Sequence, residues 1–145
     1  MLPAEQQLQW AVQALAQPAE VQPTLFPSFV VVADELALEF DHWRDVADGE
    51  VGGSWSPVQR AAVMTLDQLL SEMSGTGKPE LWVGAACLHH PQWSAVRHLA
   101  SEVLSAFGWS PGRPPLGRAV YIRGTEAEPS ISDDREEERR TRRFT

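Results

Sequence analysis

Apolar residues recur at intervals of three and four between residues 91 and 107, and this spacing constrains the fold more than any other feature. The pattern is made by Trp93, Val96, Ala100, Val103 and Phe107. Such spacing places side chains on one face of an α-helix. Proline occupies the first position and Gly108 follows the last, as is typical of helix ends. An apolar helix face needs other apolar faces to cover it, so the segment predicts a helical bundle.

Three further segments have the same periodicity. They are residues 4–17, which end before Pro18, residues 34–48, and residues 57–74, which follow the N-cap Ser56 and end at Gly75. The side chains expected on their buried faces are Leu8, Ala11, Val12 and Leu15 in the first, Leu36, Phe40, Trp43 and Ala47 in the second, and Val58, Ala62, Thr65, Leu69 and Met73 in the third.

The predicted fold class is mainly α, a bundle of four or five helices over residues 1–124. Residues 49–54 are expected to form a loop. Residues 79–88 fit either a strand or a short helix, because periodicity does not decide between them. A short two-stranded β element that pairs 29–32 with 118–123 is left open. Residues 125–145 have almost no apolar side chains and alternate acids with bases, so we expect a disordered charged tail.

Composition excludes several classes of protein. The 145 residues suffice for one domain with a real core, and no apolar run approaches the roughly 20 residues of a transmembrane helix. The net charge of −8 argues against a nucleic-acid partner. The single cysteine and an N-terminus without signal-peptide features suggest the cytoplasm. Eleven arginines, one lysine and no asparagine suggest a bacterium with a GC-rich genome.

The negative charge is concentrated in residues 34–50, which hold seven acidic side chains against the single base Arg44. Four aspartates are expected on the side of the helix opposite its apolar face, with Leu38 and His42 beside them: Asp34, Asp41, Asp45 and Asp48. Like charges at this spacing cost about 0.2–0.5 kcal/mol per pair. We therefore expect this helix to dock a basic protein partner through these six residues. The competing hypothesis is an accessory subunit with a merely solvated acidic face.

A second alternative is a small metal-binding or hydrolytic domain. Its candidate residues are His89, His90, His98 and Glu102, of which the last two are four apart and share a helix face. Cys87 lies in an apolar stretch and is expected to be a small buried hydrophobe rather than a nucleophile. We expect no catalytic residue, no metal and no cofactor.

Three stretches of the chain support a resemblance over roughly residues 25–110. They are FPSFVVVADELALEFDHWRDV, the Ser-Pro-capped helix that ends in MSG, and LW followed by PQWSAVRHLASEVLSAFGW. Together they resemble small uncharacterised helical proteins of actinobacterial type and, more loosely, immunity proteins encoded beside polymorphic toxins. The resemblance to immunity proteins implies a small acidic cytoplasmic protein that covers the active site of a toxin.

Overall fold

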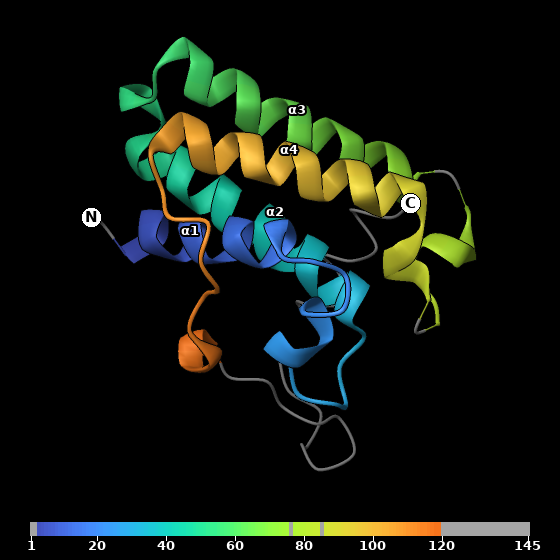
Figure 1. Cartoon of the computed structure of the whole chain (residues 1–145). Coiled ribbons are helices and arrows are strands. Elements are labelled where there is room, and N and C mark those ends of the chain that lie inside the picture. Colours follow the sequence, from blue (N-terminus) through green and yellow to red (C-terminus); the bar gives the residue numbers. More distant parts are fainter. Residues whose placement is uncertain (1–2, 76, 85, 120–145) are drawn as a thin grey trace, which may run out of the picture.

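Four α-helices make up most of the residues that the structure, a computed structural model, describes, namely 3–75, 77–84 and 86–119. They are α1 (Pro3–Ala16), α2 (Val32–Val51), α3 (Pro57–Ser74) and α4 (Pro91–Phe107), and this part of the chain contains no strand (Figure 1). The prediction of a mainly α bundle is confirmed.

Short 3-10 helices connect the α-helices, and they settle two points that the sequence leaves open. The segment 79–88 forms no strand in its described residues and instead contains two short helices of the 3-10 type, η3 (Pro79–Leu81) and the start of η4 (Cys87–His89), which decides for the short-helix alternative. Residues 28–30 form a turn, in which the Val30 amide donates to the Pro27 carbonyl, and α2 begins at Val32. The described residues of 29–32 and 118–123 therefore form no β element, and residues 120–123 lie outside the described part.

The end of α2 and the extent of the C-terminal tail also bear on the boundaries expected from the sequence. The expected loop over 49–54 begins later, because α2 continues to Val51 and is followed by η2 (Gly52–Ser54). The remaining turns are η1 (Gln22–Leu25) and η5 (Leu116–Arg118). The tail predicted for residues 125–145 lies outside the described residues.

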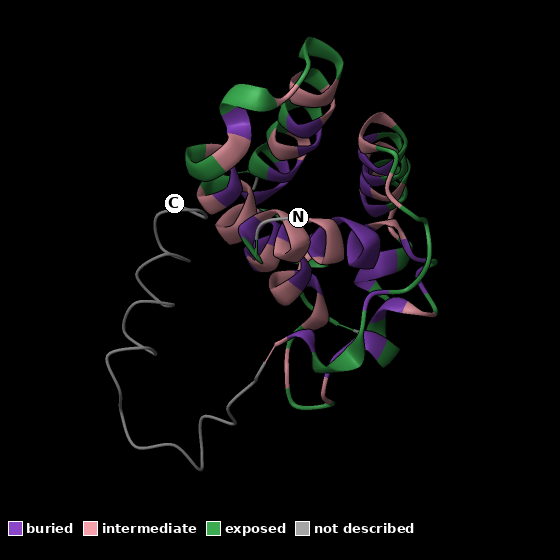
Figure 2. Ribbon diagram, turned by 90° about the vertical axis from the view of Figure 1, so that its left-hand side faces the viewer, coloured by how far each residue is buried: buried purple, intermediate pink, exposed green. Residues whose placement is uncertain are grey.

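Helix α1 packs against both α2 and α4, and α3 packs mainly against α4 (Figure 1). The residues coloured as buried lie mainly on the parts of the helices that face one another (Figure 2). All the expected core residues of α1 are buried, as are those of α4 except the half-buried Phe107. In α2 the expected core residues are buried except Trp43, which packs against the core while half-exposed.

The buried face of α3 differs from the predicted one. The residues that pack inward are Val63, Leu66, Leu70 and Met73, whereas Val58 is 69% exposed. α3 is covered mainly by α4, and of the predicted face Met73 is buried, Ala62 and Leu69 are half-buried against the core, and Val58 and Thr65 are exposed. The sequence does not show which side of α3 faces α4.

The helix ends follow their local sequence. Ser56 and Gln59 form a capping box, in which the Ser56 hydroxyl accepts from the Gln59 amide and the Gln59 side chain accepts from the Ser56 amide. Gly108 ends α4 with φ of 69°, a left-handed conformation that favours glycine.

Buried amide side chains tie the segment after α4 to α1. The Gln13 side chain donates to the Ser110 carbonyl at 2.9 Å, and the Gln17 side chain donates to the carbonyls of Pro111 and Gly112 at 3.2 Å. Gln22 is fully buried and donates to two carbonyls in the last turns of α1. These bonds satisfy buried carbonyl groups that would otherwise lack a donor.

Candidate functional site

The acidic face predicted on α2, defined by Asp34, Asp41, Asp45 and Asp48, is only partly exposed. Asp45 is exposed, whereas the other three aspartates are half-buried. Glu50, in the last turn of α2, is also exposed. No basic residue lies in that last turn to offset the negative end of the helix dipole.

Arginines from other parts of the fold offset part of this charge. Arg44 lies between Asp41, at 3.5 Å, and Asp67 of α3, at 3.4 Å. Arg60 of α3 pairs with Asp48 at 3.1 Å and also donates to the Gly52 carbonyl at 2.7 Å. Within the part of the chain that the structure describes, no ion pair reaches Asp45 or Glu50. The unbalanced charge is therefore at the C-terminal half of α2.

A third arginine serves the other flank of the helix. Arg118 is buried, donates to the carbonyls of Leu25 and Pro115, and lies 3.5 Å from the Glu39 carboxylate. Its guanidinium also stacks over the Phe26 ring at 4.9 Å. Glu39 thus belongs to the fold and not to an outward surface.

The two predicted neighbours of the acidic face differ in their exposure. Leu38 is 2% exposed, which corrects the expectation that it offers contact area. His42 is half-buried, and its ring lies edge-on to Trp43 with 4.6 Å between the ring centres. Of the six predicted binding residues, Asp45 is therefore the most accessible.

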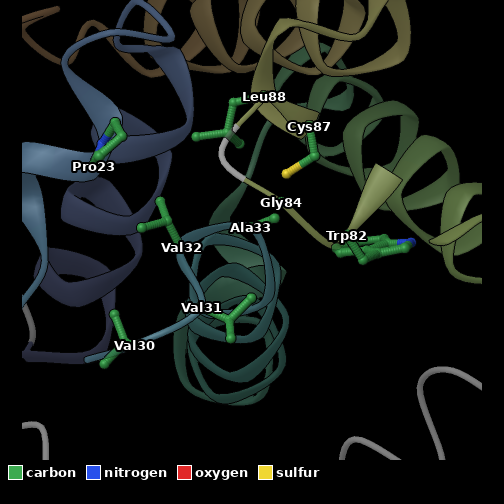
Figure 3. A pocket seen from close by; sticks show the side chains of 9 residues that line it. All are labelled: Pro23, Val30, Val31, Val32, Ala33, Trp82, Gly84, Cys87 and Leu88. Carbon is green, nitrogen blue, oxygen red and sulfur yellow. The ribbon is translucent and has the colours of Figure 1, made fainter. Parts of the chain in front are cut away.

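An apolar pocket of about 310 Å³ lies at the N-terminal end of α2 (Figure 3). Its walls are residues 30–33, Pro23, and the segment between α3 and α4 that supplies Trp82, Gly84, Cys87 and Leu88. The pocket is open to solvent where Val31 and Gly84 are exposed. We refer to it below as the α2 pocket.

The wall formed by Trp82 is fixed by two hydrogen bonds and an aromatic contact. The Trp82 indole donates to the Met73 carbonyl at 3.3 Å, and the buried Trp93 indole donates to the Leu81 carbonyl at 2.7 Å. The two rings meet edge to face, with centres 5.4 Å apart. Contacts within the fold therefore hold the Trp82 side chain in its position on the pocket wall.

The α2 pocket has a negative rim. Burial raises the pKa of the Cys87 thiol, and the negative charge of Asp34 raises it further, so this carboxylate acts electrostatically on the pocket. Beside the lining residue Leu88, Arg97 of α4 donates to the Leu88 carbonyl at 2.7 Å. Partial burial lowers the pKa of the Arg97 guanidinium, and the negative charge of Glu20 raises it. The carboxylate of Glu20 therefore offsets part of the positive charge of Arg97.

The histidine cluster does not assemble. His90 begins α4 as its N-cap, with Nδ1 accepting from the Gln92 amide at 3.1 Å. His98 and Glu102 form an exposed pair at 3.1 Å, and His89 is also exposed. Within residues 3–75, 77–84 and 86–119, no three histidine, cysteine or acidic side chains are placed to hold a metal ion. The structure therefore gives no support to a metal site at these four residues.

Sequence reasoning missed the α2 pocket and the roles of Arg60 and Arg118. The signals were the β-branched run at 30–32 and the apolar stretch before Cys87, which both line the pocket. From the sequence alone, the first is either a brief strand or an apolar entry to the next helix, and the second is either a strand or a short helix. Their proximity depends on contacts between distant parts of the chain.

None of the helices in the described residues has the length and apolarity needed to cross a membrane. Comparisons with protein-family models, with curated proteins and with solved structures found no match.

Proposed function

We propose that this protein is a non-catalytic binding module that docks a basic protein partner on helix α2. The observation that carries the proposal is the pair of exposed carboxylates, Asp45 and Glu50, that no ion pair reaches among the described residues. Negative charge in the last turn of a helix, where Glu50 lies, is unfavourable by about 0.3–1 kcal/mol. A partner that supplies positive charge would offset this cost.

The surrounding ion pairs support the same interpretation. Arg44 and Arg60 hold Asp41, Asp48 and Asp67 in fixed positions beside the exposed carboxylates. The face therefore presents oriented acceptors with a surplus of negative charge. Such a surface accelerates encounter with a basic partner and disfavours acidic ones.

The resemblance to immunity proteins suggests the class of partner. We propose a bacterial cytoplasmic setting in which the partner is a toxin with a basic active-site cleft, such as a nuclease. Binding of α2 across that cleft would exclude its substrate. A nucleic-acid cleft needs positive charge to bind phosphates, which complements this helix.

The proposal is tested by affinity capture from cells that express the protein, with quantitative mass spectrometry. The test variant is Asp45→Lys/Glu50→Lys, and the matched control is Glu72→Lys/Glu102→Lys, which makes the same charge change on exposed positions of α3 and α4. We expect wild type and control to retain a basic partner that the test variant binds at least about tenfold more weakly. Recovery should also fall as salt is raised.

Retention of the same partner by Asp45→Lys/Glu50→Lys would refute docking through α2. It would favour the accessory-subunit hypothesis, in which the acidic face is only solvated. Circular dichroism of each variant establishes that the fold is intact.

A further inference from the structure

The α2 pocket combines an apolar interior with a negative rim. Its lining is aliphatic and aromatic apart from the Cys87 thiol, and the exposed side chains Val31 and Val83 extend the apolar surface outside it. Asp34 and Glu35, in the first turn of α2, directly follow the lining residues. The complementary ligand is a bulky apolar side chain with positive charges beside it.

The volume of the pocket also limits its ligand. About 310 Å³ is at the lower end of the range of small-molecule sites, which is roughly 300–1,000 Å³. It accommodates one aromatic side chain with room for adjustment and is too small for a dinucleotide or haem. A peptide side chain is the ligand that matches both size and charge.

The chain carries such a side chain outside the described residues. Residues 139–145 read RRTRRFT, with four arginines, one phenylalanine and no acid. The preceding residues 126–138 hold seven acids and one arginine, so the positive charge is confined to the last segment. Phe144 is 25 residues beyond Ala119, and a stretch of that many residues can span at most about 80–90 Å. This is enough to reach across a small domain.

We propose that the α2 pocket is the docking site for residues 139–145 of the same chain, with Phe144 inserted and Arg142 and Arg143 facing Asp34 and Glu35. The inserted ring lies beside Cys87 and covers the exposed valines of the rim, so that residue 145 comes within reach of the Cys87 thiol. The proposal concerns the N-terminal end of α2, so it does not depend on partner docking at Asp45 and Glu50. A competing occupant is the segment 120–123 (VYIR), which offers apolar side chains but a single arginine.

Cys87 is the only cysteine and lines the pocket, so it reports on the occupant by disulfide trapping in the full chain. We compare the variants Thr145→Cys, Ser132→Cys and Tyr121→Cys, with oxidised glutathione as the oxidant. Counted from Ala119, the tether to residue 132 is half as long as that to 145, so chain statistics alone make Ser132→Cys about threefold faster than Thr145→Cys. Docking reverses this order, and we expect Thr145→Cys to form the intramolecular disulfide at least tenfold faster than Ser132→Cys.

Two controls test the chemistry of docking. We expect the disulfide with Cys87 to form only as fast as tether length alone predicts in two variants of the docked segment, Phe144→Ala/Thr145→Cys and Arg142→Glu/Arg143→Glu/Thr145→Cys. High salt should slow Thr145→Cys to the same rate. The proposal is wrong if Ser132→Cys is the faster of that pair, or if Phe144→Ala leaves the rate of Thr145→Cys unchanged. If Tyr121→Cys forms the disulfide faster than its two-residue tether alone accounts for and Phe144→Ala has no effect, residues 120–123 occupy the pocket instead.

Discussion

Replacement of Trp93 by phenylalanine tests how the fold holds the segment between α3 and α4. The Trp93 side chain is fully buried, and its indole N–H donates to the Leu81 carbonyl at 2.7 Å. Phenylalanine leaves that carbonyl without this donor, which costs about 1–3 kcal/mol. The smaller ring also leaves a void, at roughly 1–2 kcal/mol. We therefore expect Trp93→Phe to lower the free energy of unfolding by about 3 kcal/mol and Tm by about 10 °C.

The matched control is Trp55→Phe, which removes the same atoms from a different environment. Trp55 is half-buried, and its indole N–H has no hydrogen-bond partner among the described residues, although the ring packs edge-on against Phe107 with centres 5.6 Å apart. Removal of an unpaired donor costs little, so we expect a loss below about 1 kcal/mol. Urea unfolding followed by far-UV circular dichroism measures both variants. Equal losses, or a loss below 1 kcal/mol for Trp93→Phe, would refute the assigned role of the Trp93 hydrogen bond.

Three further predictions concern local features of the fold. Gly108→Ala should destabilise the protein by about 1 kcal/mol in thermal unfolding, because φ is 69° there, whereas Gly75→Ala, at φ of −88°, should be neutral or slightly stabilising. Ser56→Ala should cost about 0.5–2 kcal/mol by removing the capping box, also measured by unfolding. Burial, and then Asp34, raise the pKa of the Cys87 thiol, so at about pH 8 Ellman's reagent should modify it at least tenfold more slowly in the native protein than in urea. Since the folded pKa exceeds the unfolded one, the stability linked to this thiol is present below the unfolded pKa and is lost as pH rises through the folded value. Equal rates in the native and urea-unfolded protein would contradict this last prediction.

The four helices were predictable because their information is local. Apolar spacing, the Ser56 cap and Gly108 each act within a few residues, and each is found where expected. The buried face of α3 was not predictable in the same way. Contact with α4 decides which side of that helix is buried, so Val63 and Leu66 pack inward while Val58 is exposed.

The number of carboxylates in α2 was predictable from the sequence, but which of them are exposed was not. The sequence places seven carboxylates in residues 34–50, but of their arginine partners only Arg44 lies in that segment. Arg60 is 12 residues from Asp48, and Arg118 reaches Glu39 from beyond α4. The α2 pocket depends on the same kind of contact, because its walls come from segments about 50 residues apart. Such sites follow from topology rather than from any local pattern.

The position of Glu50 allows its effect on the stability of α2 to be measured separately from its proposed role in partner binding. Asp34 and Glu35 lie in the first turn of α2, where negative charge favours the helix, and Asp48 is offset by Arg60. Glu50 lies in the last turn with no base beside it, so the helix itself is less stable because of this residue. We expect Glu50→Lys to raise the free energy of unfolding by about 0.3–1 kcal/mol and yet to weaken capture of the basic partner. A variant that is more stable and binds equally well would assign Glu50 to the solvent and remove it from the proposed docking face.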